Sequence, residues 1–294
     1  MPELPEVETV RRGLEPVLVG NGFAHVEQRR SDLRFPLPKR FAERLTGRAV
    51  EALDRRAKYL LARLDNGEVL VMHLGMTGRF AIDKADEADL APGRFAHKQT
   101  AAVKHEHIVF HLRDGTAIRY QDVRRFGVMD LIPAASLETH ALFKGLGVEP
   151  LGEDFTAEWL AGRLRAKTTT TKAALLDQRL IAGLGNIYAC EALHRARISP
   201  LKPAGSLATK SGKPTKKTVA LVQGIKTILK SAIKAGGSSL RDYRHTDGRL
   251  GRFQHRFKVY GREGKSCMRN GCGGGIRRVV QSGRSTFFCP TCQR

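Results

Sequence analysis

Four cysteines near the end of this sequence constrain its folding more than any other feature. They follow the spacing Cys267-x4-Cys272, then sixteen residues, then Cys289-x2-Cys292. Two such pairs can place four thiolates tetrahedrally around a single Zn²⁺ ion. Five cysteines in 294 residues are too few for a disulfide scaffold. We therefore predict one structural zinc ion, whose four thiolate ligands leave no open position for catalysis.

The segment between the two cysteine pairs predicts a β-hairpin. Residues 277–280 and 285–288 flank the turn sequence Gln281-Ser282-Gly283-Arg284, which puts Arg284 beside the turn. A segment so short and polar cannot build much of a core, so the metal is expected to supply its folding energy. The fifth cysteine, Cys190, stands alone in a predicted helix and is expected to be a small buried residue.

The charge of the chain narrows the class of partner. There are 51 Lys and Arg against 29 Asp and Glu, a net charge of +22, and residues 241–294 alone hold 13 basic and 3 acidic residues. Such a field attracts polyanions, either nucleic acid or an anionic membrane surface. No strongly basic amphipathic helix and no lipidation signal favour the membrane. The sequence has no apolar run of spanning length and no apolar signal core, so we expect a cytosolic protein.

The chain has a β-rich part followed by a helical part. Two pairs of strand-like segments are each joined by a turn signal: residues 59–64 and 68–73 around Asp65-Asn66-Gly67, and residues 107–112 and 116–120 around Asp114-Gly115. Repeated hairpins favour an antiparallel sandwich, and residues 83–104 between them predict an irregular surface insertion. Helical spacing predicts helices over residues 5–19, 156–165, 172–182 and 186–196, and a last one through residues 222–232 that Gly236-Gly237 ends. Pro16 is expected to kink the first helix or end it early.

Three short motifs could bind DNA or carry chemistry, and each has an ordinary structural alternative. The turn Gly183-Leu184-Gly185-Asn186 leads into a helix whose N–H groups would bind phosphate, or it is only a packing turn. Arg124-Arg125-Phe126-Gly127 suits a phosphate contact beside a wedge between bases, or an exposed turn. Removal of Met1 would leave Pro2 as a nucleophilic secondary amine, with Glu3 beside it to move protons. Taken alone, such a start is usually an unremarkable chain end.

Together these motifs resemble the bacterial formamidopyrimidine-DNA glycosylase family along the whole chain. The matching segments are residues 1–9, 55–61, 73–76, 124–127 and 185–189 and the cysteine-rich end. The resemblance implies an α+β multidomain fold with DNA held between its parts. These parts are an N-terminal antiparallel β-sandwich with flanking helices (residues 2–133), a central helix-two-turn-helix domain (residues 137–236) and a C-terminal β-hairpin zinc finger (residues 253–294).

The resemblance also implies an enzyme of base-excision repair. It would flip 8-oxoguanine or a formamidopyrimidine out of duplex DNA, remove it, and cleave the strand as an AP lyase. Pro2 would attack C1′ of the deoxyribose to form a Schiff base, and Glu3 would protonate the opening sugar. Glu6 would position the site, and Lys58 and Arg284 match residues tied to the β- and δ-elimination steps. The resemblance further implies one structural Zn²⁺ ion and a monomeric protein. Its ligand would be double-stranded DNA with an oxidised purine or an abasic site. The protein would lie in the bacterial cytoplasm and associate with the nucleoid.

DNA contacts are implied at further positions. The matching residues are His73, Met76, His105, Arg124, Phe126, Lys167 and Asn186. Met76, Arg124 and Phe126 would fill the gap left by the flipped base, and an arginine there favours cytosine opposite the lesion. Residues 238–243 would close over the flipped base. The chain departs from the family pattern at three places. Four residues separate the first two cysteines, where two are usual, and Val123 stands where proline is common. The third departure is the insertion over residues 83–104.

Two other functions stay open at the level of the sequence. Endonuclease VIII-like glycosylases, which act on oxidised pyrimidines, share Pro2, Glu3 and the helical domain, although Leu4 and the wedge favour the purine enzyme. A non-catalytic zinc-finger DNA-binding protein would account equally well for the charge, the hairpin and the phosphate-binding turn. Only Pro2 and Glu3 together with Lys58 argue for chemistry.

Overall fold

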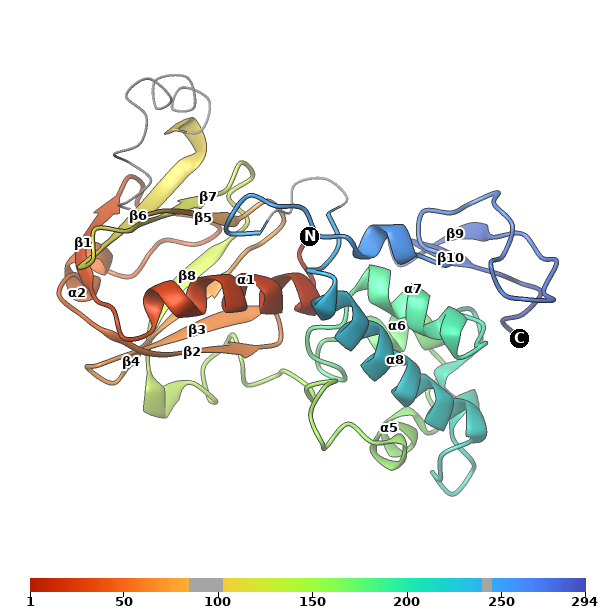
Figure 1. Cartoon of the computed structure of the whole chain (residues 1–294). Coiled ribbons are helices and arrows are strands. Elements are labelled where there is room, and N and C mark those ends of the chain that lie inside the picture. The colour runs from red at the N-terminus through yellow and green to blue at the C-terminus, as the bar shows by residue number, and fades with distance from the viewer. Residues whose placement is uncertain (85–102, 240–244) are drawn as a thin grey trace. The chain divides into compact units, whose positions relative to one another are not determined.

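The computed structural model describes residues 1–84, 103–239 and 245–294 (Figure 1). It divides into two compact units, Met1–Lys144 with Gly236–Gly251, and Gly145–Ala235 with Arg252–Arg294. The predicted insertion over residues 83–104 and the predicted closing loop over residues 238–243 lie for the most part outside the described residues. None of the described helices is long and apolar enough to cross a bilayer.

The described residues of the first unit form two four-stranded antiparallel sheets, with the strand orders β1-β6-β7-β5 and β2-β3-β4-β8 (Figure 1). The strands are β1 (Phe23–Gln28), β2 (Val50–Arg56), β3 (Tyr59–Leu64), β4 (Glu68–His73), β5 (Arg79–Asp83), β6 (Glu106–Leu112), β7 (Ala117–Gln121) and β8 (Val128–Pro133). Apolar side chains of both sheets, such as Phe110 and Leu60, belong to one buried core. The predicted sandwich is confirmed, as are both predicted hairpins, β3 with β4 and β6 with β7.

Helix α1 (Leu4–Leu18) buries one apolar face in this core, as does the short helix α2 (Phe41–Leu45). Of the two effects predicted for Pro16, a kink or an early end, the early end is wrong, because α1 continues past Pro16 to Leu18. Pro16 lies in the last turn, where its missing N–H group removes one helical hydrogen bond. The N–H of Val19 still donates to the Glu15 carbonyl at 3.0 Å and closes the helix end.

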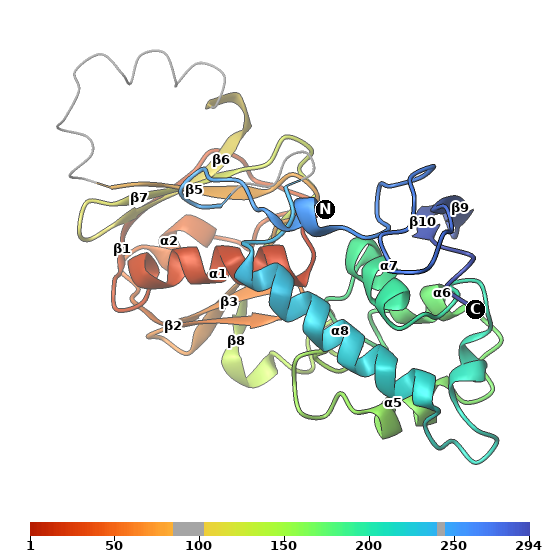
Figure 2. The same ribbon diagram turned by 45° about the vertical axis from the view of Figure 1, so that its right-hand side comes forward.

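The described part of the second unit contains α5 (Ala157–Leu164), α6 (Thr171–Leu176), α7 (Asn186–Arg195) and α8 (Lys216–Lys234). Figure 2 shows α8 alongside α7, and the two helices share one apolar core. The helix predicted over residues 172–182 is wrong in its second half, because α6 ends at Leu176. The Gln178 amide donates to the carbonyls of Leu176 at 3.1 Å and Leu184 at 2.8 Å. Its oxygen accepts the N–H of Gly183 at 2.9 Å, so one side chain stabilises a turn there.

Strands β9 (Arg277–Gln281) and β10 (Arg284–Phe288) pair antiparallel and confirm the predicted hairpin. Ser282 and Gly283 form its two-residue turn, with positive φ angles of 49° and 71°. Cys190 is buried, as expected. The described residues also contain short 3₁₀ helices at Val103–His105, Ala134–Ser136, Ala204–Leu207 and Phe253–Arg256.

Candidate nucleic-acid interface and zinc centre

The start of α1 holds the two residues predicted to carry the chemistry. Pro2 and Glu3 are buried, and Glu3 is only 4% exposed. The carboxylate of Glu6 accepts the backbone N–H of Glu3 at 2.9 Å and that of Ser238 at 2.8 Å. A Cβ on Gly237 would lie 2.9 Å from this carboxylate, and the φ of +76° there also requires glycine. Glu6 therefore fixes the backbone of Glu3 against the segment that begins after Gly237.

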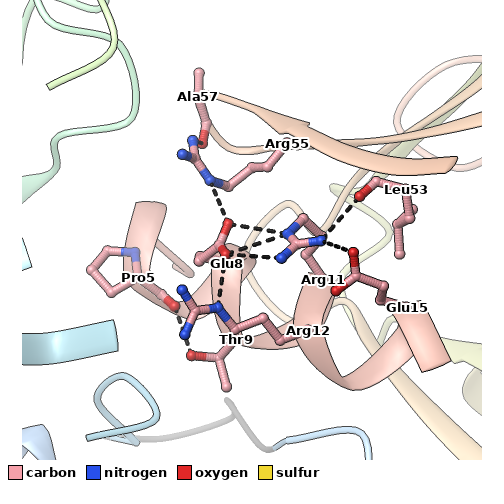
Figure 3. A network of polar contacts seen from close by, with 9 residues as sticks. All are labelled: Pro5, Glu8, Thr9, Arg11, Arg12, Glu15, Leu53, Arg55 and Ala57. Atoms are coloured by element: carbon pink, nitrogen blue, oxygen red, sulfur yellow. Dashed lines mark hydrogen bonds and ion pairs between the residues drawn. The ribbon is translucent and has the colours of Figure 1, made fainter. Parts of the chain in front are cut away.

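A network of charged side chains joins α1 to the turn between β2 and β3 (Figure 3). The Glu8 carboxylate accepts hydrogen bonds from Arg12 at 2.9 Å and Arg55 at 3.1 Å. Burial opposes the ionisation of Glu8, but its arginine donors outweigh burial and lower its pKa below the ordinary value. Arg55 also donates to the Ala57 carbonyl at 2.9 Å. The network thus fixes the turn that contains Lys58, which is 6% exposed.

His73 ends β4 and pairs with Tyr59, the residue that follows Lys58. Its Nδ1 accepts the Gly75 N–H at 3.0 Å, which assigns the ring proton to Nε2. Burial, together with the positive charges of Lys58 and Arg34, lowers the pKa of His73 to about 4. His73 is therefore an uncharged hydrogen-bond donor at neutral pH, which suits a contact with a phosphate oxygen.

Asp122 joins the two loops that carry the predicted wedge. It is completely buried, and its carboxylate accepts the Gly127 N–H at 2.8 Å and the hydroxyl of Thr77. The Thr77 oxygen in turn accepts the Arg124 N–H at 3.0 Å. The backbone N–H of Asp122 donates to the His105 carbonyl at 3.0 Å. One carboxylate therefore links the loop after β4 to the loop after β7, with His105 at their base.

The same two loops meet at Gly75, where a Cβ would lie 2.3 Å from the Phe126 carbonyl carbon. The Phe126 side chain is 42% exposed, and the Arg124 guanidinium lies 4.6 Å from the centre of its ring. Met76 directly follows Gly75 and is partly exposed. The structure thus brings the predicted wedge residues Met76, Arg124 and Phe126 onto adjoining loops.

In the second unit, Asn186 begins α7 and lies against the zinc-finger hairpin. Its Nδ2 donates to the Ser285 carbonyl at 3.0 Å, next to the exposed Arg284. Lys172 is 1% exposed and also donates to the Ser285 carbonyl at 3.0 Å. The structure therefore places Asn186 and Arg284 close to one another. Lys167 is exposed after α5, and within the described part of the chain no contact joins it to this pair.

The four cysteine sulfurs form one cluster, in which all lie within 4.8 Å of one another. The Sγ atoms of Cys267 and Cys292 are 3.9 Å apart, and those of Cys272 and Cys289 are 3.5 Å apart. Sulfurs about 2.3 Å from a tetrahedral Zn²⁺ would be about 3.8 Å apart, so the cluster fits zinc. Burial and the neighbouring thiols raise the pKa of Cys292 to about 12, so a cation is needed to keep all four groups as thiolates.

Known proteins match all three parts of the chain. Residues 1–129 match the formamidopyrimidine-DNA glycosylase N-terminal domain, residues 146–244 the H2TH domain of the same glycosylases, and residues 264–294 the zinc finger found in FPG and IleRS. A formamidopyrimidine-DNA glycosylase of Methylobacterium nodulans is 60% identical over 294 residues, which are 100% of this chain and 99% of that protein. The chain belongs to the formamidopyrimidine-DNA glycosylase family.

Other members of this glycosylase family match equally completely. The formamidopyrimidine-DNA glycosylase of Beijerinckia indica is 60% identical over 295 residues, with 100% of both chains covered. The crystal structure of MutM (Fpg) from Thermus thermophilus has 40% identity, a TM-score of 0.81, and coverage of 99% of this chain and 98% of that chain. A Lactococcus lactis FPG variant with Fapy-dG DNA has 38% identity, a TM-score of 0.82 and 100% coverage of both chains. These matches confirm the predicted fold class, and the zinc-finger match with the sulfur cluster confirms one structural zinc.

Sequence reasoning missed several buried polar residues that hold the predicted site residues of this glycosylase family member in place. Asp122 offered a signal, because an acidic residue two positions before the arginine of a predicted wedge is well placed to hold the loop. Lys172 offered none, since a lysine in the first turn of a helix is usually solvated. Thr77 likewise resembles any threonine in a surface turn.

Proposed function

We propose that this protein is a base-excision-repair DNA glycosylase that removes 8-oxoguanine and formamidopyrimidines from duplex DNA and then cleaves the strand as an AP lyase. The relatives at 60% identity carry the name formamidopyrimidine-DNA glycosylase. Solved Lactococcus lactis relatives hold DNA that contains Fapy-dG or an abasic site. The net charge of +22 supports sequence-independent attraction to the duplex backbone, which weakens as salt is added.

The observation that carries the chemical proposal is the burial of Pro2 and Glu3 at the start of α1. Removal of Met1 converts the Pro2 nitrogen from an amide into a secondary amine. Its lone pair attacks C1′ of the flipped nucleotide, and the base leaves with the bonding electrons and takes up a proton. Glu3 protonates the ring oxygen as the sugar opens, which leaves an iminium between Pro2 and C1′.

Two eliminations then cut the strand. Loss of a proton from C2′ expels the phosphate on the 3′ side, and loss of a proton from C4′ expels the phosphate on the 5′ side. Water finally hydrolyses the iminium and releases Pro2. We assign Lys58 and Arg284 to these eliminations, because a cation beside each flanking phosphate stabilises the charge on the leaving group. Lys58 is fixed in a tight turn, whereas Arg284 is exposed beside the hairpin turn.

DNA binding is assigned to two groups of residues. Met76, Arg124 and Phe126 enter the space left by the flipped base, and Arg124 pairs with the orphaned cytosine. The proposed backbone contacts are His73, His105, Lys167 and Asn186. The contact of Asn186 with the finger supports its place here, because its Nδ2 donates to the Ser285 carbonyl at 3.0 Å and so puts the start of α7, where the helix dipole favours an anion, beside Arg284.

Borohydride trapping on a duplex with one abasic site tests the chemistry. We expect a covalent adduct from the wild-type protein, a severe loss of adduct in Pro2→Gly, and full adduct in Glu15→Gln, a control at a half-exposed position of the same helix. Glu3→Gln should block removal of 8-oxoguanine more than cleavage of an abasic site. A wild-type protein that binds DNA without forming an adduct would leave only the non-catalytic function. Equal loss of both activities in Glu3→Gln would contradict its assigned role.

Oxidised pyrimidines are the second candidate substrate. A solved Lactococcus lactis Fpg structure at 37% identity to this chain contains DNA with an oxidised pyrimidine. Excision from 8-oxoguanine:C and thymine glycol:A duplexes compares the two, and a strong preference for thymine glycol would overturn the purine assignment. We further propose that the protein acts as a monomer in the bacterial cytoplasm, on the nucleoid. A dimer mass in light scattering would contradict the monomer.

A further inference from the structure

One face of α7 follows the zinc finger along the whole length of the helix. Asn186, Cys190 and His194 are spaced four residues apart and therefore lie on the same face. Asn186 donates to the Ser285 carbonyl at 3.0 Å, and Cys190 belongs to the small apolar core of the finger. At the other end of α7, Nε2 of His194 lies 3.4 Å from Sγ of Cys267. The finger therefore contacts this helix from its first turn to its last.

Glu191 adds a polar contact in the middle of α7. Its carboxylate is 1% exposed and accepts the consecutive backbone N–H groups of Lys258, Val259 and Tyr260 at 2.9 to 3.1 Å. Burial raises the pKa of Glu191, although these N–H donors favour its charged form. The segment that leads into the finger is thus held by one buried acidic side chain.

Arg269 holds the finger at the C-terminal end of α7. It lies in the four-residue spacing between Cys267 and Cys272, where the family pattern has two residues. Its Nη2 donates to the His194 carbonyl at 2.5 Å and also lies 3.4 Å from the Arg195 carbonyl. The His194 carbonyl also accepts the Arg197 N–H at 3.1 Å. The C-terminal end of a helix carries partial negative charge, so the guanidinium is a favourable second donor there.

We infer that Arg269 and His194 are positioning residues for DNA binding by the zinc finger. Arg269 caps α7, and Nε2 of His194 lies 3.4 Å from Sγ of Cys267, where it can donate a hydrogen bond to that sulfur as a zinc-bound thiolate. These two contacts fix the metal knuckle to one end of the helix. A helix of ten residues is about 15 Å long, and its other end carries Asn186 beside the hairpin. Fixing the knuckle therefore keeps Arg284 in register with Asn186. The functional part of this inference rests on the proposed function.

Arg269→Ala, purified with zinc, tests the first step. We expect a chelating dye to remove zinc about tenfold faster, because the knuckle loses its attachment to α7. The Kd for a duplex with a tetrahydrofuran abasic analogue should rise about tenfold, while kcat at saturating substrate DNA stays within about twofold. Lys265→Ala removes the same charge from an exposed position of the same finger and should match the wild type in all three measurements. Arg269→Lys should give intermediate values, because an ammonium cannot hold two carbonyls as a guanidinium does.

Equal effects of Arg269→Ala and Lys265→Ala would overturn the inference, since charge alone would then explain them. His194→Phe should also release zinc faster than the wild type, whereas His194→Gln keeps an N–H donor and should release it more slowly than His194→Phe. If both His194 variants release zinc at the wild-type rate, His194 has no positioning role and the inference fails.

A double-mutant cycle tests the link to Asn186. If Arg269 acts by keeping the finger in register with Asn186, Arg269→Ala should weaken DNA binding much less in the Asn186→Ala background than in the wild type. Fully additive effects would show that Arg269 contributes independently and would overturn the proposed link. Failure of the proposed function is a separate result, because the wild-type protein would then form no borohydride adduct, whereas the zinc-release measurements need no DNA.

Discussion

Replacing Asp122 by asparagine tests whether one buried carboxylate holds the wedge in place. Asparagine keeps the shape of the side chain but offers one acceptor oxygen where aspartate offers two. If that oxygen faces the Gly127 N–H, the NH₂ group faces Thr77. The Thr77 hydroxyl then has no acceptor for its proton, while its oxygen still accepts the Arg124 N–H. The substitution therefore weakens the link between the two wedge loops without leaving a cavity.

The cost in the free energy of unfolding follows from three hydrogen bonds, donated to Asp122 by Gly127, Tyr120 and Thr77. A hydrogen bond to a charged group contributes about 1.5–3 kcal/mol, and one between neutral groups about 0.5–1.5 kcal/mol. Weakening two bonds by about 1 kcal/mol each and losing the third costs about 3.5–5 kcal/mol, from which the easier burial of a neutral amide must be subtracted. We expect a net loss of about 2–3 kcal/mol, or about 5–10 °C in the Tm of the first unit.

The assay separates the wedge from the chemistry. Single-turnover excision of 8-oxoguanine opposite cytosine should be about tenfold slower in Asp122→Asn, which corresponds to about 1.4 kcal/mol. Cleavage of an abasic site in single-stranded DNA requires no wedge and should change by less than about twofold. Asp130→Asn removes a charge from β8 and should match the wild type in both assays. A variant as stable as the wild type, or an equal fall in both activities, would refute the role given to Asp122.

Three further perturbations test other parts of the molecule. The pKa of His73 is about 4 in the folded protein and about 6.5 in an unfolded chain. Between these pH values the unfolded state binds more protons, so the free energy of unfolding should fall as the pH drops from 6.5 to 4. In urea titrations at pH 7 and 4.5, His73→Gln should abolish about 2–3 kcal/mol of that fall. Chelation of zinc should remove hydrogen-exchange protection from β9 and β10 but not from the sandwich, and loss in both would contradict a local role for the metal. Glu191→Gln should lower the free energy of unfolding of the second unit by about 2 kcal/mol in calorimetry, because an NH₂ group then faces backbone N–H donors. Glu158→Gln, at an exposed position, should leave this free energy unchanged.

The hairpins and the zinc cluster were predictable because their signals are local. Gly67 and Gly115 lie at positive φ in the turns of the first two hairpins, and Ser282-Gly283 forms the turn of the third. The cysteine spacing likewise indicated that four sulfurs would meet, as they do within 4.8 Å. The end of α6 was not predictable from propensity, because it depends on the Gln178 side chain contacting Leu184 six residues away. Local patterns thus predicted where elements form better than where they end.

The positioning residues were out of reach of the sequence for a related reason. Thr77 and Asp122 are 45 residues apart, Lys172 and Ser285 are 113 apart, and Arg269 and His194 are 75 apart. A single sequence shows the chemistry of a residue and its near neighbours, but not the distant carbonyl or hydroxyl that it will contact in the fold. Most residues proposed to contact DNA, such as Met76, Phe126 and Asn186, belong to recognisable motifs, because the ligand determines their chemistry. The groups that hold them are determined by the fold, so substitutions there should change DNA binding without removing any contact with DNA.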